Sequence, residues 1–198
     1  MQIKDILSRN YVEVSLCALH HPCSLVRSCI SGGSKVVFDF DQVTKDYRQH
    51  KKMPSCASVD ALIENKDTIC FVEMKGWKDF LDHTANISEY KIQKQAAKYN
   101  LAYKLSCSIE TCIGLLCDEA GVGAESDFLS TSKCYIVVTD INIQQDPLIS
   151  LASNLNLLAE TASDWETICW KHLKEKVEQV KGMKTLFVSC RDFDSLFI

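Results

Sequence analysis

The stretch FVEMK, Phe71–Lys75, ends an apolar run by placing a carboxylate and an ammonium group two positions apart. Successive side chains of a β-strand point to opposite faces, so Glu73 and Lys75 share one face while Met74 points to the other. This pattern is typical of an active site at the end of a strand. The alternative is an ion pair on an exposed strand, which contributes only about 0–1 kcal/mol.

A second apolar run, ASVDALI, precedes this strand and contains Asp60. The polar residues ENKD between the two runs predict a hairpin with the four-residue loop Glu64–Asp67. In that register Asp60 lies opposite Phe71 and shares a face with Glu73, its diagonal neighbour about 7–8 Å away. An odd-length loop would turn Asp60 to the other face, so the pairing of the two carboxylates depends on loop parity.

Two neighbouring carboxylates raise the pKa of at least one of them unless a cation offsets their like charges. Aspartate and glutamate oxygens suit a hard ion such as Mg²⁺ or Mn²⁺, which keeps waters and takes further ligands from a substrate phosphate. Such an ion activates a bound water and neutralises charge during phosphoryl transfer. With Lys75 on the same face to orient or deprotonate that water, the residues Asp60, Glu73 and Lys75 predict phosphodiester hydrolysis.

The patterning of the rest of the chain predicts an α/β protein. Apolar periodicity and turn residues predict a helix at 3–10, strands at 35–40, 57–63 and 68–75, and helices from 87 to about 117, broken near 100–107. A loop at 118–132, a strand at 134–141, helices within 146–182 and a strand at 185–190 follow.

The 198 residues contain neither a repeat nor a flexible linker, so the sequence predicts a single domain over 1–198. The eleven cysteines are odd in number, and the charged N-terminus MQIKDILSRN is not a secretory signal. These features predict reduced thiols in a cytoplasmic protein, and no apolar stretch is long enough to span a membrane. The net charge of −4 means that any nucleic-acid binding must rest on a local basic face.

Asp60, followed after twelve residues by Glu73-Met74-Lys75 on a hairpin within this order of elements, resembles the PD-(D/E)XK nuclease superfamily. The resemblance implies an α/β, restriction-endonuclease-like core with a central mixed β-sheet flanked by helices. That core would cover about 35–141, with an N-terminal helical addition and a C-terminal helix–strand addition. It also implies a divalent-metal-dependent nuclease, and superfamily precedent favours DNA over RNA.

The same resemblance implies residue roles. Asp60 and Glu73 would hold Mg²⁺ or Mn²⁺, the Met74 carbonyl would be a further metal ligand, and Lys75 would be the catalytic lysine. The first helix often supplies an upstream acidic ligand in this superfamily, and Glu13 is the leading candidate for it. The alternatives are Asp39 and Asp41.

Downstream, Gln95-Ala-Ala-Lys-Tyr99 resembles the QxxxY helix motif of the RecB-like branch, whose glutamine and tyrosine lie beside the active site and help to place the substrate. Lysines at helical spacing on the same segment predict a stripe that can lie along a phosphate backbone, although such a stripe is more commonly only a solvated face. The predicted nucleic-acid-binding residues are Lys78, Lys91, Lys94 and Lys98.

Compact nucleases of this kind resemble those of restriction, mobile-element and anti-phage defence systems, where a partner often supplies recognition. The resemblance therefore leaves open a protein partner. It also leaves open a homodimer, because double-strand cleavage needs two sites. The alternative from a different class is a nuclease-like fold that serves as a non-catalytic binding or assembly subunit, which the acidic net charge favours and the intact set of Asp60, Glu73 and Lys75 opposes.

Overall fold

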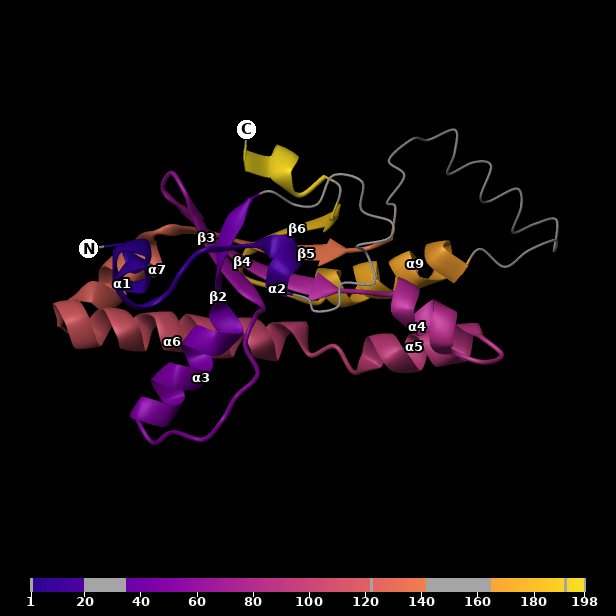
Figure 1. The fold of residues 1–198 in the computed structure, drawn as a ribbon, viewed down its shortest axis with the longest axis horizontal. Coiled ribbons are helices and arrows are strands. Elements are labelled where there is room, and N and C mark those ends of the chain that lie inside the picture. The colour runs from indigo at the N-terminus through magenta and orange to yellow at the C-terminus, as the bar shows by residue number, and fades with distance from the viewer. Residues whose placement is uncertain (1, 20–34, 122, 142–164, 191, 198) are drawn as a thin grey trace.

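The computed structural model describes residues 2–19, 35–121, 123–141, 165–190 and 192–197. These residues form an α/β fold in which helices flank a six-stranded sheet (Figure 1). Strands β1 to β4 pair antiparallel, whereas β4, β5 and β6 pair parallel, so the sheet is mixed. The predicted α/β class with a central mixed sheet is therefore confirmed.

The described elements follow one another in nearly the predicted order. They are α1 (Ile3–Asn10), β1 (Val14–Ser15), α2 (Leu16–Leu19), β2 (Val36–Asp39), α3 (Phe40–His50), β3 (Ala61–Asn65), β4 (Thr68–Lys75), α4 (Lys78–His83), α5 (Glu89–Ala97), α6 (Leu101–Ala120), α7 (Ala124–Ser130), β5 (Ser132–Thr139), α9 (Trp165–Glu178), β6 (Lys184–Ser189) and the 3-10 helix η2 (Asp194–Phe197). The predicted loop at 118–132 is wrong, because α6 continues to Ala120 and α7 follows. Of the predicted helices within 146–182, the part before 165 lies outside the described residues.

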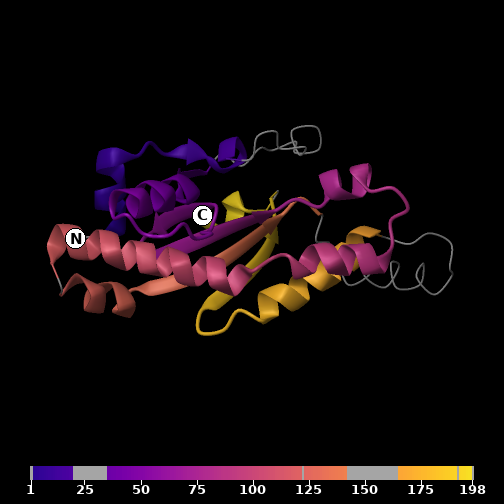
Figure 2. The same cartoon turned by 90° about the horizontal axis from the view of Figure 1, so that it is seen from below.

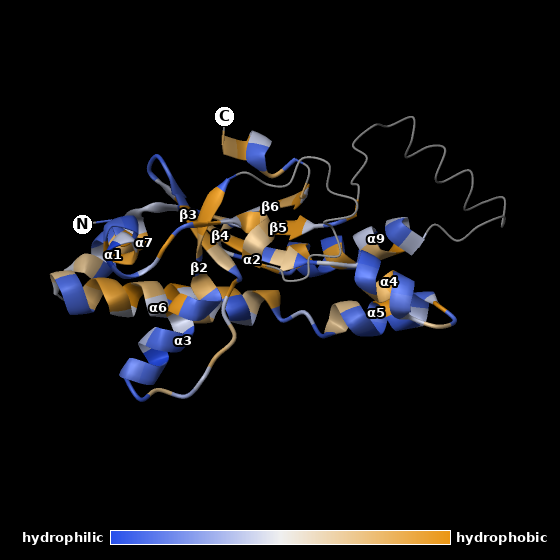
Figure 3. Cartoon of the chain, viewed as in Figure 1, coloured by the Kyte–Doolittle hydropathy of each residue, from blue (hydrophilic) through white to orange (hydrophobic). Residues whose placement is uncertain are grey.

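The sheet separates two hydrophobic clusters. One lies between the sheet and helices α1, α3, α5, α6 and α9, and it includes Phe71 and Tyr135. The other, on the opposite face, packs Met74 and Val72 against α2 and the C-terminal segment. Figure 2 shows α6 running along the first face, and Figure 3 shows hydrophobic residues on the central strands while α3 and α5 are largely hydrophilic. Alternate residues of β4 therefore enter different clusters, as a strand buried on both faces requires.

The β3–β4 hairpin has a shorter loop than predicted. Asn65 pairs with Thr68, which leaves the two-residue turn Lys66–Asp67, and Lys66 takes a left-handed backbone with φ of 54°. The predicted four-residue loop is wrong, but both lengths are even, so the faces are unchanged. Extending the observed register by one residue places Asp60 opposite Glu73 instead of Phe71, which brings the two carboxylates closer than predicted.

The chain after β4 is held by Asp140, which directly follows β5. Its carboxylate accepts hydrogen bonds from the backbone N–H groups of Trp77, at 2.7 Å, and Lys78, at 2.9 Å. Trp77 is fully buried and packs edge-on against Phe80 and Tyr99, each with ring centroids 5.6 Å apart. These contacts fix the path of the chain directly after Lys75. Among the described helices, none offers an apolar stretch that could span a lipid bilayer.

Candidate active site

Asp60, Glu73 and Lys75 lie side by side at the carboxyl end of β4. Lys75 Nζ forms an ion pair with Glu73 Oε1 and a 3.1 Å hydrogen bond with the Met74 carbonyl. The Met74 N–H donates to Asp60 Oδ2 at 2.6 Å. The side chain of Glu73 is 0% exposed and that of Lys75 is 12% exposed. Met74 thus contributes its backbone, while its side chain is buried in the cluster on the other face of the sheet.

The structure adds a residue that the sequence analysis missed. Lys104, in the first turns of α6, places its Nζ 2.7 Å from Glu73 Oε1 and 3.6 Å from Asp60 Oδ1. Lys104 follows Leu101 by three positions and adjoins Leu105, and both leucines are buried. A lysine on the apolar face of an amphipathic helix needs a buried anionic partner, and that pattern was the available signal.

Burial and the charge of Asp60 shift the pKa of Glu73 in one direction, and the two lysine charges shift it in the other. Burial raises the pKa of Glu73, and the neighbouring charge of Asp60 raises it further, while Lys75 and Lys104 oppose both effects without cancelling them. For Lys104, burial by itself lowers the pKa, but the charges of Glu73 and Asp60 outweigh it, so its pKa is raised and the ammonium is retained. The site therefore holds two ammonium groups against buried acidic oxygens.

The raised pKa of Glu73 has a testable sign. Between the ordinary glutamate pKa of about 4.3 and the higher folded value, the folded state binds more protons than the unfolded state, so its stability falls as pH rises through that interval. In a buffer that contains EDTA to remove divalent cations, we expect the free energy of unfolding of the wild type to fall relative to that of Glu73→Gln as the pH rises through this interval. Urea unfolding across pH 4–8 measures it, with the exposed Glu125→Gln as control. A wild type that gains stability relative to Glu73→Gln would contradict the sign.

A third carboxylate near the site is that of Asp41, one of the two alternatives to Glu13 as the upstream acidic ligand, and the choice among them stays a prediction. Asp41 accepts a 2.6 Å hydrogen bond from Ser58, and the charge of Asp60 contributes to raising its pKa, after burial. Glu13 instead lies 3.8 Å from the ammonium of Lys4. The Lys4 backbone N–H binds Glu64 near the hairpin turn, about four strand residues or 13 Å from Asp60. Glu13 directly precedes β1, the edge strand of the sheet, whose Val14 pairs with Val37.

The predicted QxxxY residues adjoin the lysine. The Lys75 Nζ lies 5.1 Å from the centre of the Tyr99 ring, within the range of a cation–π contact. Gln95 hydrogen-bonds the Tyr99 side chain, and burial raises the pKa of Tyr99. Tyr99 was predicted to lie on the helix, whereas α5 ends at Ala97 and Tyr99 follows it. Tyr99, which Gln95 contacts, thus flanks the ammonium of Lys75 beside the two carboxylates.

The predicted nucleic-acid-binding lysines lie on α4 and α5, in different surroundings. The side chain of Lys78 is half-buried, and Lys91 Nζ donates to a backbone carbonyl of the preceding loop at 2.6 Å. Lys94 lines a cavity of about 460 Å³ between α5 and α9. Lys98 is exposed at the end of α5, one residue before Tyr99. Their contact with nucleic acid stays a prediction, and Lys98 is the member closest in sequence to the site.

The donor set fits a hard divalent cation. Within the described residues no cluster of three or more histidine, cysteine, aspartate or glutamate side chains is arranged to hold a metal. Mg²⁺, however, is commonly held by one or two carboxylates, with water and substrate phosphate as the other ligands. Asp60 and Glu73 supply two carboxylates, and Glu73 Oε2 is buried without a hydrogen-bond partner among the described residues. An unpartnered buried carboxylate oxygen is costly unless it receives a cation or a donor.

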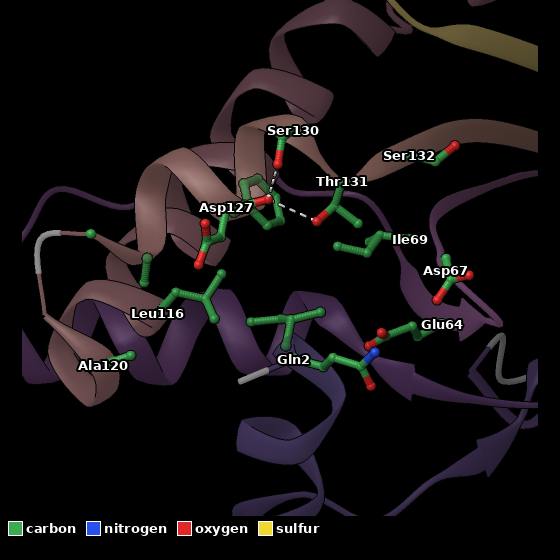
Figure 4. A pocket seen from close by; sticks show the side chains of 14 residues that line it. Gln2, Glu64, Asp67, Ile69, Leu116, Ala120, Asp127, Ser130, Thr131 and Ser132 are labelled. Atoms are coloured by element: carbon green, nitrogen blue, oxygen red, sulfur yellow. Dashed lines mark hydrogen bonds between the residues drawn. The ribbon is translucent and has the colours of Figure 1, made fainter.

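Two cavities lie near the two ends of the β3–β4 hairpin. One, of about 600 Å³, lies beside the site and is lined by Asp41, Ser58 and Lys45 among others. The other, of about 590 Å³, lies at the opposite end of β4 (Figure 4). Its lining includes Glu64 and Asp127 and, among the described residues, contains no lysine or arginine, so it does not suit a phosphate. The first cavity, whose lining includes Lys45 and Arg48, suits an anionic ligand better.

Comparisons with protein-family models, curated proteins and solved structures found nothing that matches this chain. The candidate site is therefore defined by the chain's own residues. They are Asp41, Asp60, Glu73, Lys75, Tyr99 and Lys104.

Proposed function

We propose that this protein is a divalent-metal-dependent nuclease that hydrolyses phosphodiester bonds, with DNA favoured over RNA by superfamily precedent. The observation that carries the proposal is the convergence of Asp60, Glu73 and Lys75 on one face at the end of β4, with Glu73 fully buried. An ion pair that served only to stabilise the strand would lie in solvent, because burying both charges costs several kcal/mol. Buried charged groups that carry this free-energy cost are concentrated at functional sites.

Asp60 and Glu73 would hold Mg²⁺ or Mn²⁺, with the Met74 carbonyl as a further ligand. When bound, such an ion supplies a Lewis acid that polarises the phosphate and activates water. Lys75, whose Nζ the Tyr99 ring flanks at 5.1 Å, would orient the attacking water, and its neutral amine would accept the proton that the water loses, which leaves an ammonium and a hydroxide. Burial of Glu73 excludes bulk water and thereby strengthens these interactions.

The wider setting follows from the same resemblance. The order of β2, β3, β4, helices and β5 supports a restriction-endonuclease-like core within a single domain over 1–198. We place the protein in the cytoplasm, in a restriction, mobile-element or anti-phage system, with a protein partner or a second copy of the chain supplying recognition.

A second function is favoured by one observation. The Lys104 ammonium lies between Asp60 and Glu73 and offsets their charge without any metal. A nuclease-like fold that acts only as a binding or assembly subunit would keep such an internal ion pair. It would have no need of a divalent cation.

Cleavage assays separate the two functions. We expect the purified protein to cut DNA in Mn²⁺ or Mg²⁺ and to be inactive in EDTA, with single- and double-stranded DNA and RNA compared as substrates. Binding of Mn²⁺ without cleavage would indicate a missing partner. The nuclease proposal fails if calorimetry detects no Mn²⁺ binding and no substrate is cut.

A further inference from the structure

Lys104 occupies the space between the two carboxylates that are proposed to hold the metal. Its Nζ lies 2.7 Å from Glu73 Oε1 and 3.6 Å from Asp60 Oδ1. A Mg²⁺ ion held by Asp60 and by either oxygen of Glu73, including the unpartnered Oε2, would come close to this ammonium. An ammonium and a divalent cation cannot share that space, because like charges at such a separation repel strongly.

The position of Lys104 is set by the backbone. Ser108, one turn further along α6, is fully buried, and its hydroxyl donates to the Lys104 carbonyl at 2.8 Å. The same hydroxyl accepts a 2.9 Å hydrogen bond from the N–H of Val59, the residue before Asp60. One side chain thus ties the backbone of Lys104 to the backbone beside Asp60. The packing of α6 therefore holds the Lys104 ammonium next to the carboxylates of Asp60 and Glu73.

The side chain of Lys104 is also partly exposed to solvent, so its ammonium can move away from the carboxylates. Its side chain is 22% exposed, compared with 16% for Asp60 and 0% for Glu73. The four-carbon stem of a lysine allows the ammonium to move while the backbone stays in place. Lys104 is positioned between both carboxylates, whereas Lys75 has the Met74 carbonyl as a second partner and can stay there, so the departure of Lys104 leaves one cation at the site.

We propose that Lys104 is the resident counter-ion of the Asp60–Glu73 pair, which a divalent cation must displace, so that Lys104 sets the metal concentration at which the site is loaded. This inference rests on the proposed function. When the metal-competent arrangement is populated for only a fraction of the time, the apparent dissociation constant is weakened by that fraction. A neutral residue at 104 removes the competitor.

Calorimetric titration with Mn²⁺ tests the inference on the full chain. We expect Lys104→Met to bind Mn²⁺ on the order of 10- to 100-fold more tightly than the wild type, and Lys104→Arg, which keeps the charge, to resemble the wild type. Addition of Mn²⁺ should also raise the melting temperature more in Lys104→Met, because tighter binding to the folded state stabilises it more. Lys51→Met is the matched control, since Lys51 contacts the single carboxylate of Asp118 at 2.8 Å on the surface.

Each other outcome overturns the inference. Equal affinity in wild type and Lys104→Met, or weaker binding in the variant, would reject the competing role of Lys104 while leaving the metal site and the proposed function intact. Absence of Mn²⁺ binding in both proteins would reject the proposed function together with the inference. If Lys104→Met does not fold without metal, Lys104→Gln keeps a hydrogen-bond donor to Glu73 and is expected to show the same tightening.

Discussion

Replacing Lys75 with alanine is expected to lower metal-dependent cleavage by about 100- to 10,000-fold, the range in which positioned proton-transfer groups contribute. The Lys75 ammonium contacts Glu73 and the Met74 carbonyl and lies against the ring of Tyr99, and these contacts fix its position at the site. Steady-state cleavage of a fluorescent DNA duplex in Mn²⁺ measures the loss. Mn²⁺ binding by calorimetry should persist, because the carboxylates remain.

Two further variants make this result specific. Lys75→Arg keeps the positive charge but cannot give up a proton, so we expect it to stay within about tenfold of Lys75→Ala. Recovery of activity in Lys75→Arg would show that only the charge matters and would reject a proton-transfer role. Lys174→Ala, which removes an exposed lysine 3.9 Å from Glu178 on α9, should cleave like the wild type.

Replacing Asp140 with alanine is expected to lower the free energy of unfolding by about 2 to 4 kcal/mol, because two hydrogen bonds to a buried carboxylate are lost. The Asp140 side chain is nearly buried and accepts hydrogen bonds from two backbone N–H groups, those of Trp77 and Lys78. Hydrogen bonds to a charged group are each worth about 1.5–3 kcal/mol, and the variant leaves the buried Trp77 N–H without its acceptor. Urea unfolding monitored by circular dichroism measures the change.

The controls for Asp140 separate its hydrogen bonds from its charge. Asp140→Asn keeps one acceptor oxygen, so its loss should be intermediate. Asp118→Ala removes an exposed partner of Lys51 and should cost less than about 1 kcal/mol. A loss in Asp140→Ala no larger than that in Asp118→Ala would reject the anchoring role. Because Trp77 also contacts Tyr99, Asp140→Ala should reduce cleavage even where the protein stays folded.

Sequence periodicity was sufficient for the elements that carry the site. The strand 68–75 was predicted with the bounds that β4 has, and the helical segment from 87 divides at about 100 into α5 and α6 as predicted. The shared face of Asp60 and Glu73 was also predictable, because it depends only on whether the loop length is even. The loop length itself was not, because Glu64 and Asn65 are polar yet pair through their backbones, and backbone hydrogen bonds do not depend on side-chain polarity.

By itself, then, the sequence determined which residues of the hairpin share a face, since strand geometry relates neighbours in the chain. Only the tertiary structure decided which side chains from other elements lie against that face. Lys104 reaches Asp60 and Glu73 because α6 packs across the sheet, and Asp41 comes near Asp60 because α3 begins directly at the end of β2. Such contacts depend on how helices and strands pack, which local periodicity does not specify.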